Sequence, residues 1–184
     1  HQIEKYSQAG LFTGIFALVQ VFVAMEPQET VYFANPGPDG KFNKDFYFHW
    51  ADFNNEPISD WKAIAGDFLS IPMAHQMIGF YTVADDTDGV LKVMRSYQYY
   101  AARAISTKVA KTDWSRPNQL GGFIWHTTGS GKTMTSFKSA QLIANSKDAD
   151  KVIFLMDRIE LGTQSYICTH PIMSNYAWGR IVNT

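Results

Sequence analysis

The sequence has 184 residues, of which 46% are hydrophobic and 15% aromatic, so the chain can bury the core of one or two globular domains. Its 16 lysine and arginine residues and 17 acidic residues give a net charge of −1. An autonomous DNA-binding domain is usually strongly basic. The balanced charge therefore argues against DNA binding by this stretch alone, although a basic groove can be completed elsewhere in a larger protein.

Cysteine content and hydropathy indicate a cytoplasmic chain that does not bind membranes. Cys168 is the single cysteine, which excludes an internal disulfide and is typical of a reducing compartment. The most apolar run, residues 11–25, contains polar residues and is shorter than the roughly 20 residues of a membrane span. His1 is not an initiator methionine and no signal-peptide pattern precedes this run. We therefore expect the sequence to start within a longer protein.

Residues 1–58 predict a helix followed by strands. Apolar residues recur at helical spacing over residues 3–18. The segments 21–25 and 31–34 are rich in β-branched and aromatic residues and flank a short proline-containing loop, which predicts a β-hairpin. A third aromatic segment, residues 46–50, predicts a further strand.

Residues 59–88 predict a helical connector. Ser59 or Asp60 can cap a first helix, and Pro72 can end that helix and begin a second one. The acidic, glycine-containing turn at residues 85–89 is the candidate domain boundary.

Residues 89–164 predict the beginning of a parallel sheet. After a helix over residues 97–110, a short strand is expected at 122–125, a helix at 132–144 and a strand at 152–156. The order strand, helix, strand is a βαβ unit with a right-handed crossover. The fold class expected for the chain is therefore α/β.

A glycine-rich loop joins the predicted strand to the predicted helix at residues 127–133, whose sequence is Thr-Thr-Gly-Ser-Gly-Lys-Thr. Gly129 and Gly131 allow the backbone to curl around an anion, and the start of the helix adds a positive dipole end. Lys132 can neutralise the β- and γ-phosphates of a nucleotide, and the Thr133 hydroxyl can ligate Mg²⁺. The loop thus predicts an ATP site with Mg²⁺ held through the nucleotide, unless the Gly-Lys-Thr run is a chance turn before a helix.

Two residues outside the loop extend this prediction. Gln98 precedes Lys132 by 34 positions, and its amide can both donate to and accept from the edge of adenine. The alternative for Gln98 is an exposed glutamine without contacts. Arg158 follows the second predicted strand and can pair with a nucleic-acid phosphate or, equally well, with a neighbouring carboxylate. The expected nucleotide ligands are Arg95, Gln98, Thr128, Gly129, Ser130, Gly131, Lys132 and Thr133.

The loop departs from the general phosphate-loop pattern at one position, because His126 stands five residues before Gly131 where that pattern has glycine. The form Thr-Gly-Ser-Gly-Lys-Thr resembles that of superfamily 2 helicases and translocases. Within that class the runs 121–133, 136–138, 152–158 and 94–98 resemble the R subunit, the restriction and motor subunit, of type I restriction enzymes.

The resemblance extends towards the start of the chain. Residues 20–23, 32–35 and 46–50 resemble the stretch that joins the nuclease domain of that subunit to its first motor domain. Gln2 and Tyr6 resemble a Q-x-x-x-Y element that follows the nuclease carboxylates in this family. Residues 165–184 resemble nothing in the family.

The resemblance implies a domain plan and an activity. Residues 1–58 would end a nuclease domain, 59–88 would connect it to the motor, and 89–164 would begin a RecA-like motor domain, with 165–184 unassigned. The intact subunit would couple ATP hydrolysis to translocation of double-stranded DNA and would then cleave that DNA. Methylation and specificity subunits would be its partners. Histidines elsewhere, at positions 49, 75, 126 and 170, are expected to be ordinary core or surface residues.

Other assignments remain open from the sequence. The chain has no acidic motor motif after the predicted βαβ unit and no cluster with zinc-ligand spacing. A different superfamily 2 helicase or a type III restriction subunit would carry the same loop. A module that binds nucleotide without hydrolysing it would also lack the acidic motif. This stretch alone is expected to be catalytically inactive.

Overall fold

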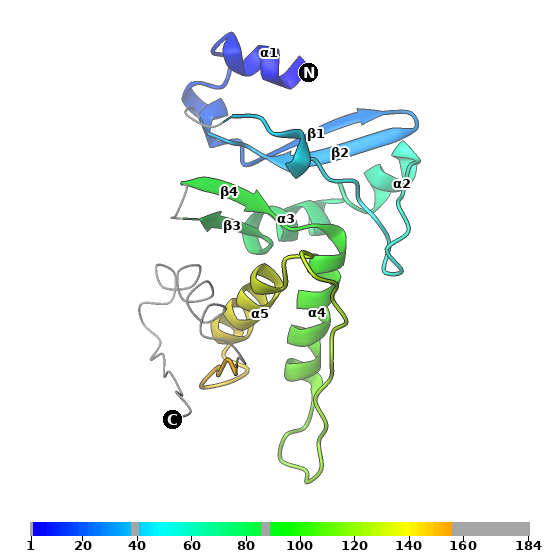
Figure 1. Ribbon diagram of the computed structural model, residues 1–184, viewed down its shortest axis with the longest axis vertical. Coiled ribbons are helices and arrows are strands. Elements are labelled where there is room, and N and C mark those ends of the chain that lie inside the picture. The colour runs from blue at the N-terminus through cyan, green and yellow to red at the C-terminus, as the bar shows by residue number, and fades with distance from the viewer. Residues whose placement is uncertain (1, 38–40, 86–88, 156–184) are drawn as a thin grey trace. The chain divides into compact units, whose positions relative to one another are not determined.

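The chain folds as two compact units, His1–Tyr97 and Gln98–Thr184. The computed structural model describes residues 2–37, 41–85 and 89–155 (Figure 1). Helices and strands are mixed, and both sheets in these ranges are two-stranded and antiparallel. The broad expectation of a chain with both helices and strands is confirmed. Its assignment to a nuclease end, a connector and a RecA-like portion stays a prediction.

The first unit is built on a β-hairpin of β1 (Val21–Glu26) and β2 (Glu29–Ala34), as the sequence predicts. The strands pair without a bulge, from Val21 opposite Ala34 to Glu26 opposite Glu29, so the turn between them contains two residues. Residues that alternate along a strand point to opposite faces. On β2, this alternation buries the side chains of Thr30 and Tyr32 on one face.

Aromatic side chains form the core of the first unit. The Tyr32 ring lies 4.7 Å from the Phe68 ring and 6.0 Å from the Trp50 ring, measured between centroids. Trp50 is completely buried, and its indole Nε1 donates a hydrogen bond of 3.0 Å to Asp67 Oδ2. The Tyr32 hydroxyl donates to the Met94 carbonyl at 3.0 Å, and burial raises the pKa of this phenol far above its ordinary value. The polar end of each large ring thus has a partner inside the core.

The third strand predicted over residues 46–50 is absent. Lys44–Phe46 forms a short 3-10 helix, η2, and the backbone of Phe48 then exchanges two hydrogen bonds of 2.9 Å with Tyr32. This is an isolated bridge and not a strand. The aromatic residues of the segment are held by ring packing, such as the stacking of Tyr47 on Phe33 at 4.1 Å, and a regular ladder is not needed for that contact.

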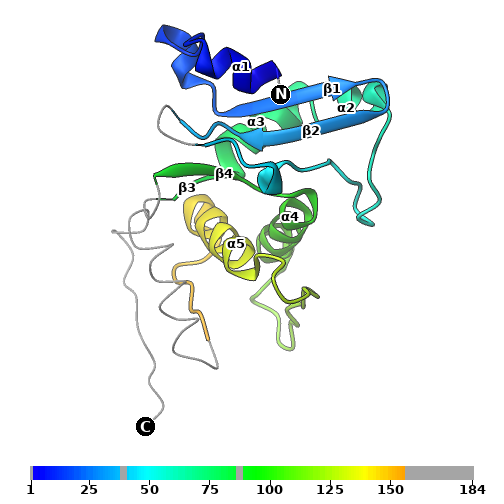
Figure 2. The same ribbon diagram turned by 45° about the horizontal axis from the view of Figure 1, so that its top comes forward.

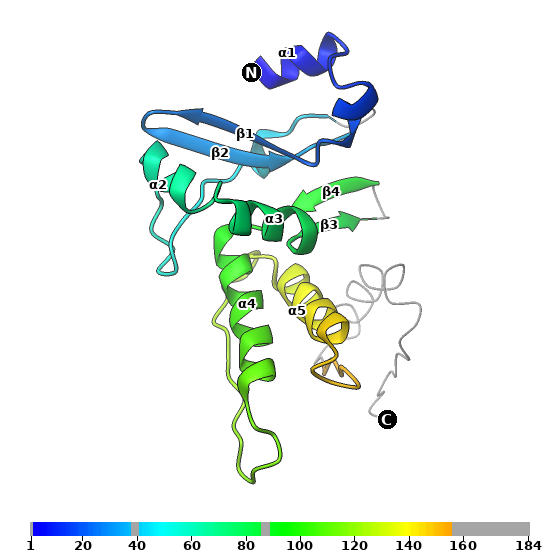
Figure 3. The same cartoon turned by 180° about the vertical axis from the view of Figure 1, so that it is seen from behind.

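The two helices predicted between residues 59 and 88 are present as α2 (Trp61–Gly66) and α3 (Ile71–Phe80), and their role as a connector stays a prediction. Asp60 caps α2 by accepting a hydrogen bond from the Ala63 N–H at 3.1 Å, and Pro72 lies in the first turn of α3. Figure 3 shows α3 beside β3 (Thr82–Asp85), which pairs antiparallel with β4 (Val90–Val93). The acidic turn that the sequence offers as a domain boundary therefore connects two strands of one hairpin, and the compact units divide further along the chain.

The helical pattern at the start of the chain is divided in two. Helix α1 spans Gln2–Gln8, and a separate 3-10 helix, η1, spans Gly14–Leu18. Gly10 between them has a φ of 71°, a conformation that a continuous helix does not contain. The apolar side chains of Ile15 and Leu18 in η1 are exposed, so the predicted apolar face of this segment is not buried within the described residues.

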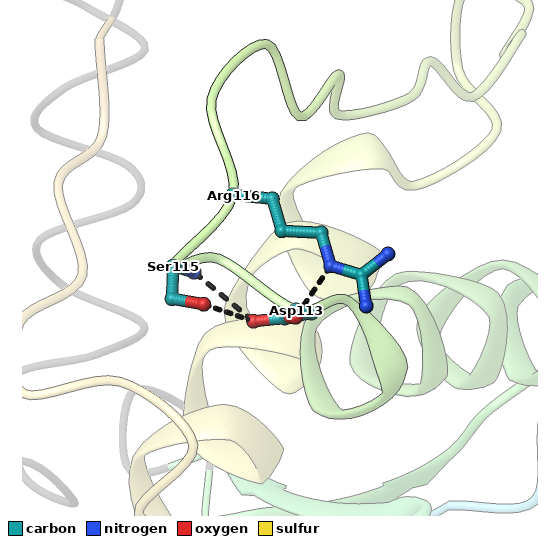
Figure 4. A network of polar contacts seen from close by, with 3 residues as sticks. All are labelled: Asp113, Ser115 and Arg116. Carbon is teal, nitrogen blue, oxygen red and sulfur yellow. Dashed lines mark hydrogen bonds and ion pairs between the residues drawn. The ribbon is translucent and has the colours of Figure 1, made fainter.

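The second unit contains two helices, α4 (Ser96–Lys111, which begins in the first unit) and α5 (Lys132–Ser146), both predicted from the sequence. They lie side by side in Figure 2. After α4, Asp113 accepts hydrogen bonds from the Ser115 N–H, the Ser115 hydroxyl and Arg116 Nε (Figure 4). These bonds lower the pKa of Asp113, and the bond from the Ser115 hydroxyl has the largest effect. They also hold the turn after which the chain runs back towards the start of α5.

The two strands predicted around α5 are absent from the described residues. Residues 122–125 and 152–155 have irregular backbone, and Met156 lies outside the described ranges. Trp125 is 89% exposed and Leu155 is 87% exposed. A strand requires a ladder partner for its backbone groups, and neither segment has one in the described part of the chain. The predicted βαβ unit is therefore not formed there.

Candidate functional site

The glycine-rich loop turns directly into α5. Residues 128–130 form the turn, with Gly129 at a φ of 78°, and Gly131 at a φ of 76° is the N-cap of the helix. Both glycines occupy the left-handed region, which costs a residue with a side chain about 1–2 kcal/mol. The pattern of glycines in the sequence therefore reflects the backbone that the loop adopts.

Lys132 and Thr133 occupy the first turn of α5. Lys132 is exposed, and its Nζ donates a hydrogen bond of 3.1 Å to the carbonyl of Thr127 across the loop. Thr133 follows it and is half-buried. The ammonium group and the positive end of a 15-residue helix together favour an anion at this place.

Gln98, on α4, lies against the same loop. Its side chain is only 5% exposed, and its Nε2 donates to the carbonyls of Ser130 at 3.3 Å and Gly131 at 3.4 Å. A Cβ atom added to Gly131 would overlap Gln98 Nε2. The alternative of an exposed glutamine without contacts is excluded, and a role for Gln98 in reading adenine stays a prediction.

His126 is a loop residue that the sequence interpretation did not include in the site. Its Nδ1 lies 2.9 Å from Ser130 Oγ, and Ser130 Oγ lies 2.7 Å from the Thr127 carbonyl oxygen. Burial, and then the positive charge of Lys132, lower the pKa of His126. The one signal in the sequence was the departure from glycine at the first position of the loop.

The remaining predicted site residues have contacts of their own. In the first unit, the guanidinium of Arg95 lies over the Phe48 ring at 4.6 Å and donates to the Tyr97 hydroxyl at 3.1 Å. On α1, Gln2 Nε2 donates to the Tyr6 hydroxyl at 2.8 Å, so these two residues are brought together one helical turn apart. Arg158 lies outside the described residues.

Neither a ready-made metal cluster nor a membrane helix is found in the described ranges. Histidine, cysteine and carboxylate side chains do not come together there in groups of three or more that could hold a metal ion. None of the helices described is both long enough and apolar enough to cross a bilayer.

Comparison with known proteins identifies similar sequences over the whole chain. The SWI2/SNF2 ATPase family matches residues 97–174. The type I restriction enzyme SauCOLORF180P endonuclease subunit of Staphylococcus aureus (strain COL) is 36% identical over 184 residues, which are 100% of this chain and 18% of that subunit. The SsaAORF53P endonuclease subunit of Staphylococcus saprophyticus is 36% identical over 90% of the chain and 17% of its own length. The EcoprrI endonuclease subunit of Escherichia coli is 32% identical over 68% of the chain and 40% of its own length. The chain thus spans about a fifth of the length of the staphylococcal relatives.

Proposed function

Because the chain belongs to the family of type I restriction enzyme endonuclease subunits, we propose that its second unit binds ATP as part of a DNA-translocating motor. The observation that carries this proposal is the loop itself. Two glycines with left-handed backbone precede α5, and Lys132 stands in the first turn of that helix. This is the arrangement that phosphate-binding loops require, and the ATPase family match includes it.

Each loop residue has a proposed role towards the nucleotide. The backbone from Thr128 to Gly131 surrounds the phosphates, and Lys132 exchanges its contact with the Thr127 carbonyl for the β- and γ-phosphate oxygens. The hydroxyl of Thr133 and the phosphates of the nucleotide would hold Mg²⁺. When bound, Mg²⁺ supplies charge neutralisation of the phosphate oxygens.

Gln98 completes the proposed nucleotide site within the second unit. Its side chain holds the loop carbonyls, and a glutamine amide can recognise the edge of adenine. Arg95, three residues earlier in the chain, stays a further predicted nucleotide ligand. For Gln98→Ala we expect the preference for ATP over GTP to weaken more than the maximal rate, measured by competition binding with both nucleotides. An unchanged preference would refute adenine recognition.

For the intact subunit we propose ATP-driven translocation of double-stranded DNA followed by cleavage, in the cytoplasm, together with methylation and specificity subunits. Arg158 would contact the DNA backbone. Gln2 and Tyr6 would act in the nuclease domain, supported by the hydrogen bond that holds their side chains together. Replacement of either by alanine should reduce cleavage and leave ATP hydrolysis in place. Loss of hydrolysis with intact cleavage would place them elsewhere.

Other superfamily 2 helicases and type III restriction subunits share the loop chemistry, but the match of all 184 residues of this chain to a type I endonuclease subunit favours the proposal above. A nucleotide-binding module without hydrolysis would bind ATP with the same loop. A measurement of ATP hydrolysis by the intact subunit distinguishes the motor from this binding module. Hydrolysis requires groups that act on the transition state in addition to the ground-state contacts of the loop.

Lys132→Ala in the intact subunit tests the proposed function. Loss of the ammonium group should abolish ATP-dependent translocation and cleavage, because a positioned charge on a transferring phosphate contributes several kcal/mol. The matched control is Lys108→Ala, which removes an exposed lysine from α4. We would measure phosphate release and cleavage of plasmid DNA. Movement along DNA by the Lys132→Ala variant would contradict the assignment of the loop.

A further inference from the structure

His126 makes a side-chain contact that the usual residue at its position cannot make. The general phosphate-loop pattern places glycine there, and glycine has no side chain. Here the imidazole is half-buried and reaches across the loop to Ser130, with 2.9 Å between Nδ1 and Oγ. The side chains at the first and fifth positions of the phosphate-loop pattern, residues 126 and 130, are therefore joined directly.

The donors and acceptors of this contact can be assigned. The Ser130 hydroxyl has one hydrogen, and its oxygen lies 2.7 Å from the Thr127 carbonyl, which can only accept. The hydroxyl hydrogen therefore points to Thr127, since two oxygen atoms without a hydrogen between them would repel each other. Ser130 Oγ in turn accepts from His126, so the imidazole carries its proton on Nδ1.

The same Thr127 carbonyl also holds Lys132. Its oxygen accepts from Lys132 Nζ at 3.1 Å in addition to the Ser130 hydroxyl. A chain of three hydrogen bonds thus leads from His126 through Ser130 and the Thr127 carbonyl to Lys132. In this chain of bonds the imidazole of His126 contacts Ser130 directly. Ser130 and Thr127 lie between His126 and Lys132.

The charge state of His126 agrees with this assignment. Burial, followed by the positive charge of Lys132, lowers the pKa of the imidazole and favours its neutral form. A neutral ring carries one hydrogen, and the contact with Ser130 places it on Nδ1. A positive charge on His126 would instead face the ammonium group of Lys132.

We propose that His126 is a positioning residue, which holds the phosphate loop in its curled shape before the nucleotide arrives by fixing the Ser130 hydroxyl on the Thr127 carbonyl. This inference rests on the proposed function of the loop as an ATP site. A loop with two glycines has many alternative conformations, and ordering them beforehand increases affinity for a ligand. The effect of His126 therefore falls on nucleotide affinity, and the maximal rate of hydrolysis is little changed.

The test compares three substitutions in the intact subunit. His126→Asn keeps a donor, because the asparagine amide nitrogen and histidine Nδ1 are both attached at Cγ. His126→Leu has the shape of asparagine and no donor, and Ser130→Ala removes the acceptor. We expect the Leu and Ala variants each to bind ATP and ADP about three- to tenfold more weakly, which is the loss of one hydrogen bond. For His126→Leu, kcat should stay within about twofold. His126→Asn should stay within about twofold of the unaltered subunit in affinity, under the same relation.

A double variant and a control complete the design. Because His126 and Ser130 act through one contact, the His126→Leu/Ser130→Ala variant should bind no more weakly than the weaker single variant. Ser106→Ala removes a hydroxyl that also donates to a carbonyl three residues earlier, at 3.1 Å, but lies on α4, and it should leave affinity unchanged. Multiplied effects in the double variant, or an Asn variant as weak as Leu, would overturn the inference. If Lys132→Ala abolishes activity while His126→Leu binds normally, only the positioning role fails.

Discussion

The two units differ in the burial of their large apolar side chains. In the first unit these side chains are buried between elements that are close in sequence. In the second unit the large apolar side chains next to the phosphate loop are exposed to solvent. Trp50 is fully buried against Phe68 and Tyr32. Trp125, immediately before His126, is 89% exposed. Both tryptophans belong to aromatic segments that the sequence predicts as strands, and neither segment is a strand in the structure.

The difference shows what an aromatic, β-branched segment needs from its surroundings. The hairpins β1–β2 and β3–β4 find their partner strands within a few residues. The segment around Trp50 makes isolated bridges and no regular ladder, and Trp50 packs on Tyr32 of the first hairpin and on Phe68 in the turn after α2. The segment around Trp125 has neither a strand partner nor a packed neighbour in the described part of the chain, and Trp125 is exposed. Local pattern therefore predicts that a segment is apolar, and only its neighbours decide whether it is a strand.

The largest expected effect tests this contrast directly. Trp50→Ala should lower the free energy of unfolding by about 3–5 kcal/mol, because it leaves a cavity and an unpartnered Asp67 carboxylate. Trp125→Ala is the matched change and should cost about 0.5 kcal/mol or less in the 184-residue chain. Urea unfolding followed by circular dichroism measures both. Equal losses would show that Trp125 has a buried partner.

The same two substitutions, Trp50→Ala and Trp125→Ala, can also be compared in the intact subunit. If residues 122–125 pair with chain outside the 184 residues, the cost of Trp125→Ala should rise to about 2 kcal/mol or more, the range for a buried aromatic side chain. The cost of Trp50→Ala should not change, since its partners lie in the first unit. A small cost for Trp125 in both forms would mean that this segment remains exposed.

The two loop glycines provide a second, smaller effect within the second unit. Both have positive φ, but a Cβ at Gly129 meets no atom within 4 Å, whereas a Cβ at Gly131 would overlap Gln98 Nε2. Gly129→Ala should therefore cost about 1–2 kcal/mol for its backbone alone. Gly131→Ala should cost more, and combining it with Gln98→Ala should cost less than the sum of the single changes. Additive costs by urea unfolding would show that Gln98 does not press on the loop.

Lys138 on α5 provides an effect that depends on pH. It is 4% exposed, its Nζ donates to Gln141 Oε1 at 2.7 Å, and burial lowers its pKa to about 8. An unfolded lysine has a pKa of about 10.4. Between these values the unfolded chain binds more protons than the folded chain, so stability should rise as the pH rises from about 8 to about 10.4.

Lys138→Met should remove this dependence. Below about pH 8 the variant should be more stable than the unaltered chain by about 1–3 kcal/mol, since a buried ammonium no longer has to be desolvated. The advantage should disappear as the pH approaches 10.4. Lys108→Met, at an exposed position of α4, is the control and should show no such trend. A constant difference across this pH range would mean that Lys138 keeps its ordinary pKa.

Local signals in the sequence predicted the elements that depend on local chemistry. Asp60 and Pro72 marked the starts of α2 and α3, because a cap and a first-turn proline act within one helical turn. Gly129 and Gly131 marked the turn of the phosphate loop, since their backbone conformation excludes most other residues. The short connection between two β-rich segments gave the first hairpin.

The rest depended on contacts that a linear pattern does not contain. Residues 46–50 alternate like a strand, yet ring packing against Phe33 and Tyr32 holds them as irregular backbone. The sequence predicts an ordinary histidine at position 126, because the contact of His126 with Ser130 exists only once the loop has curled. The amide chemistry of Gln98 and its spacing to Lys132 predict a contact with adenine, but its contact with the Ser130 and Gly131 carbonyls cannot be inferred from spacing.

The hydrogen bond from the Tyr32 hydroxyl to the Met94 carbonyl has a consequence for synthesis on the ribosome. It joins two positions 62 residues apart and closes the aromatic core of the first unit. The β1–β2 hairpin can form as soon as it leaves the exit tunnel, but the Tyr32 phenol has no Met94 partner until β4 has also emerged. A nascent chain that stalls before Met94 would therefore expose a tyrosine, a tryptophan and a phenylalanine in one place, where chaperones that bind apolar surfaces act.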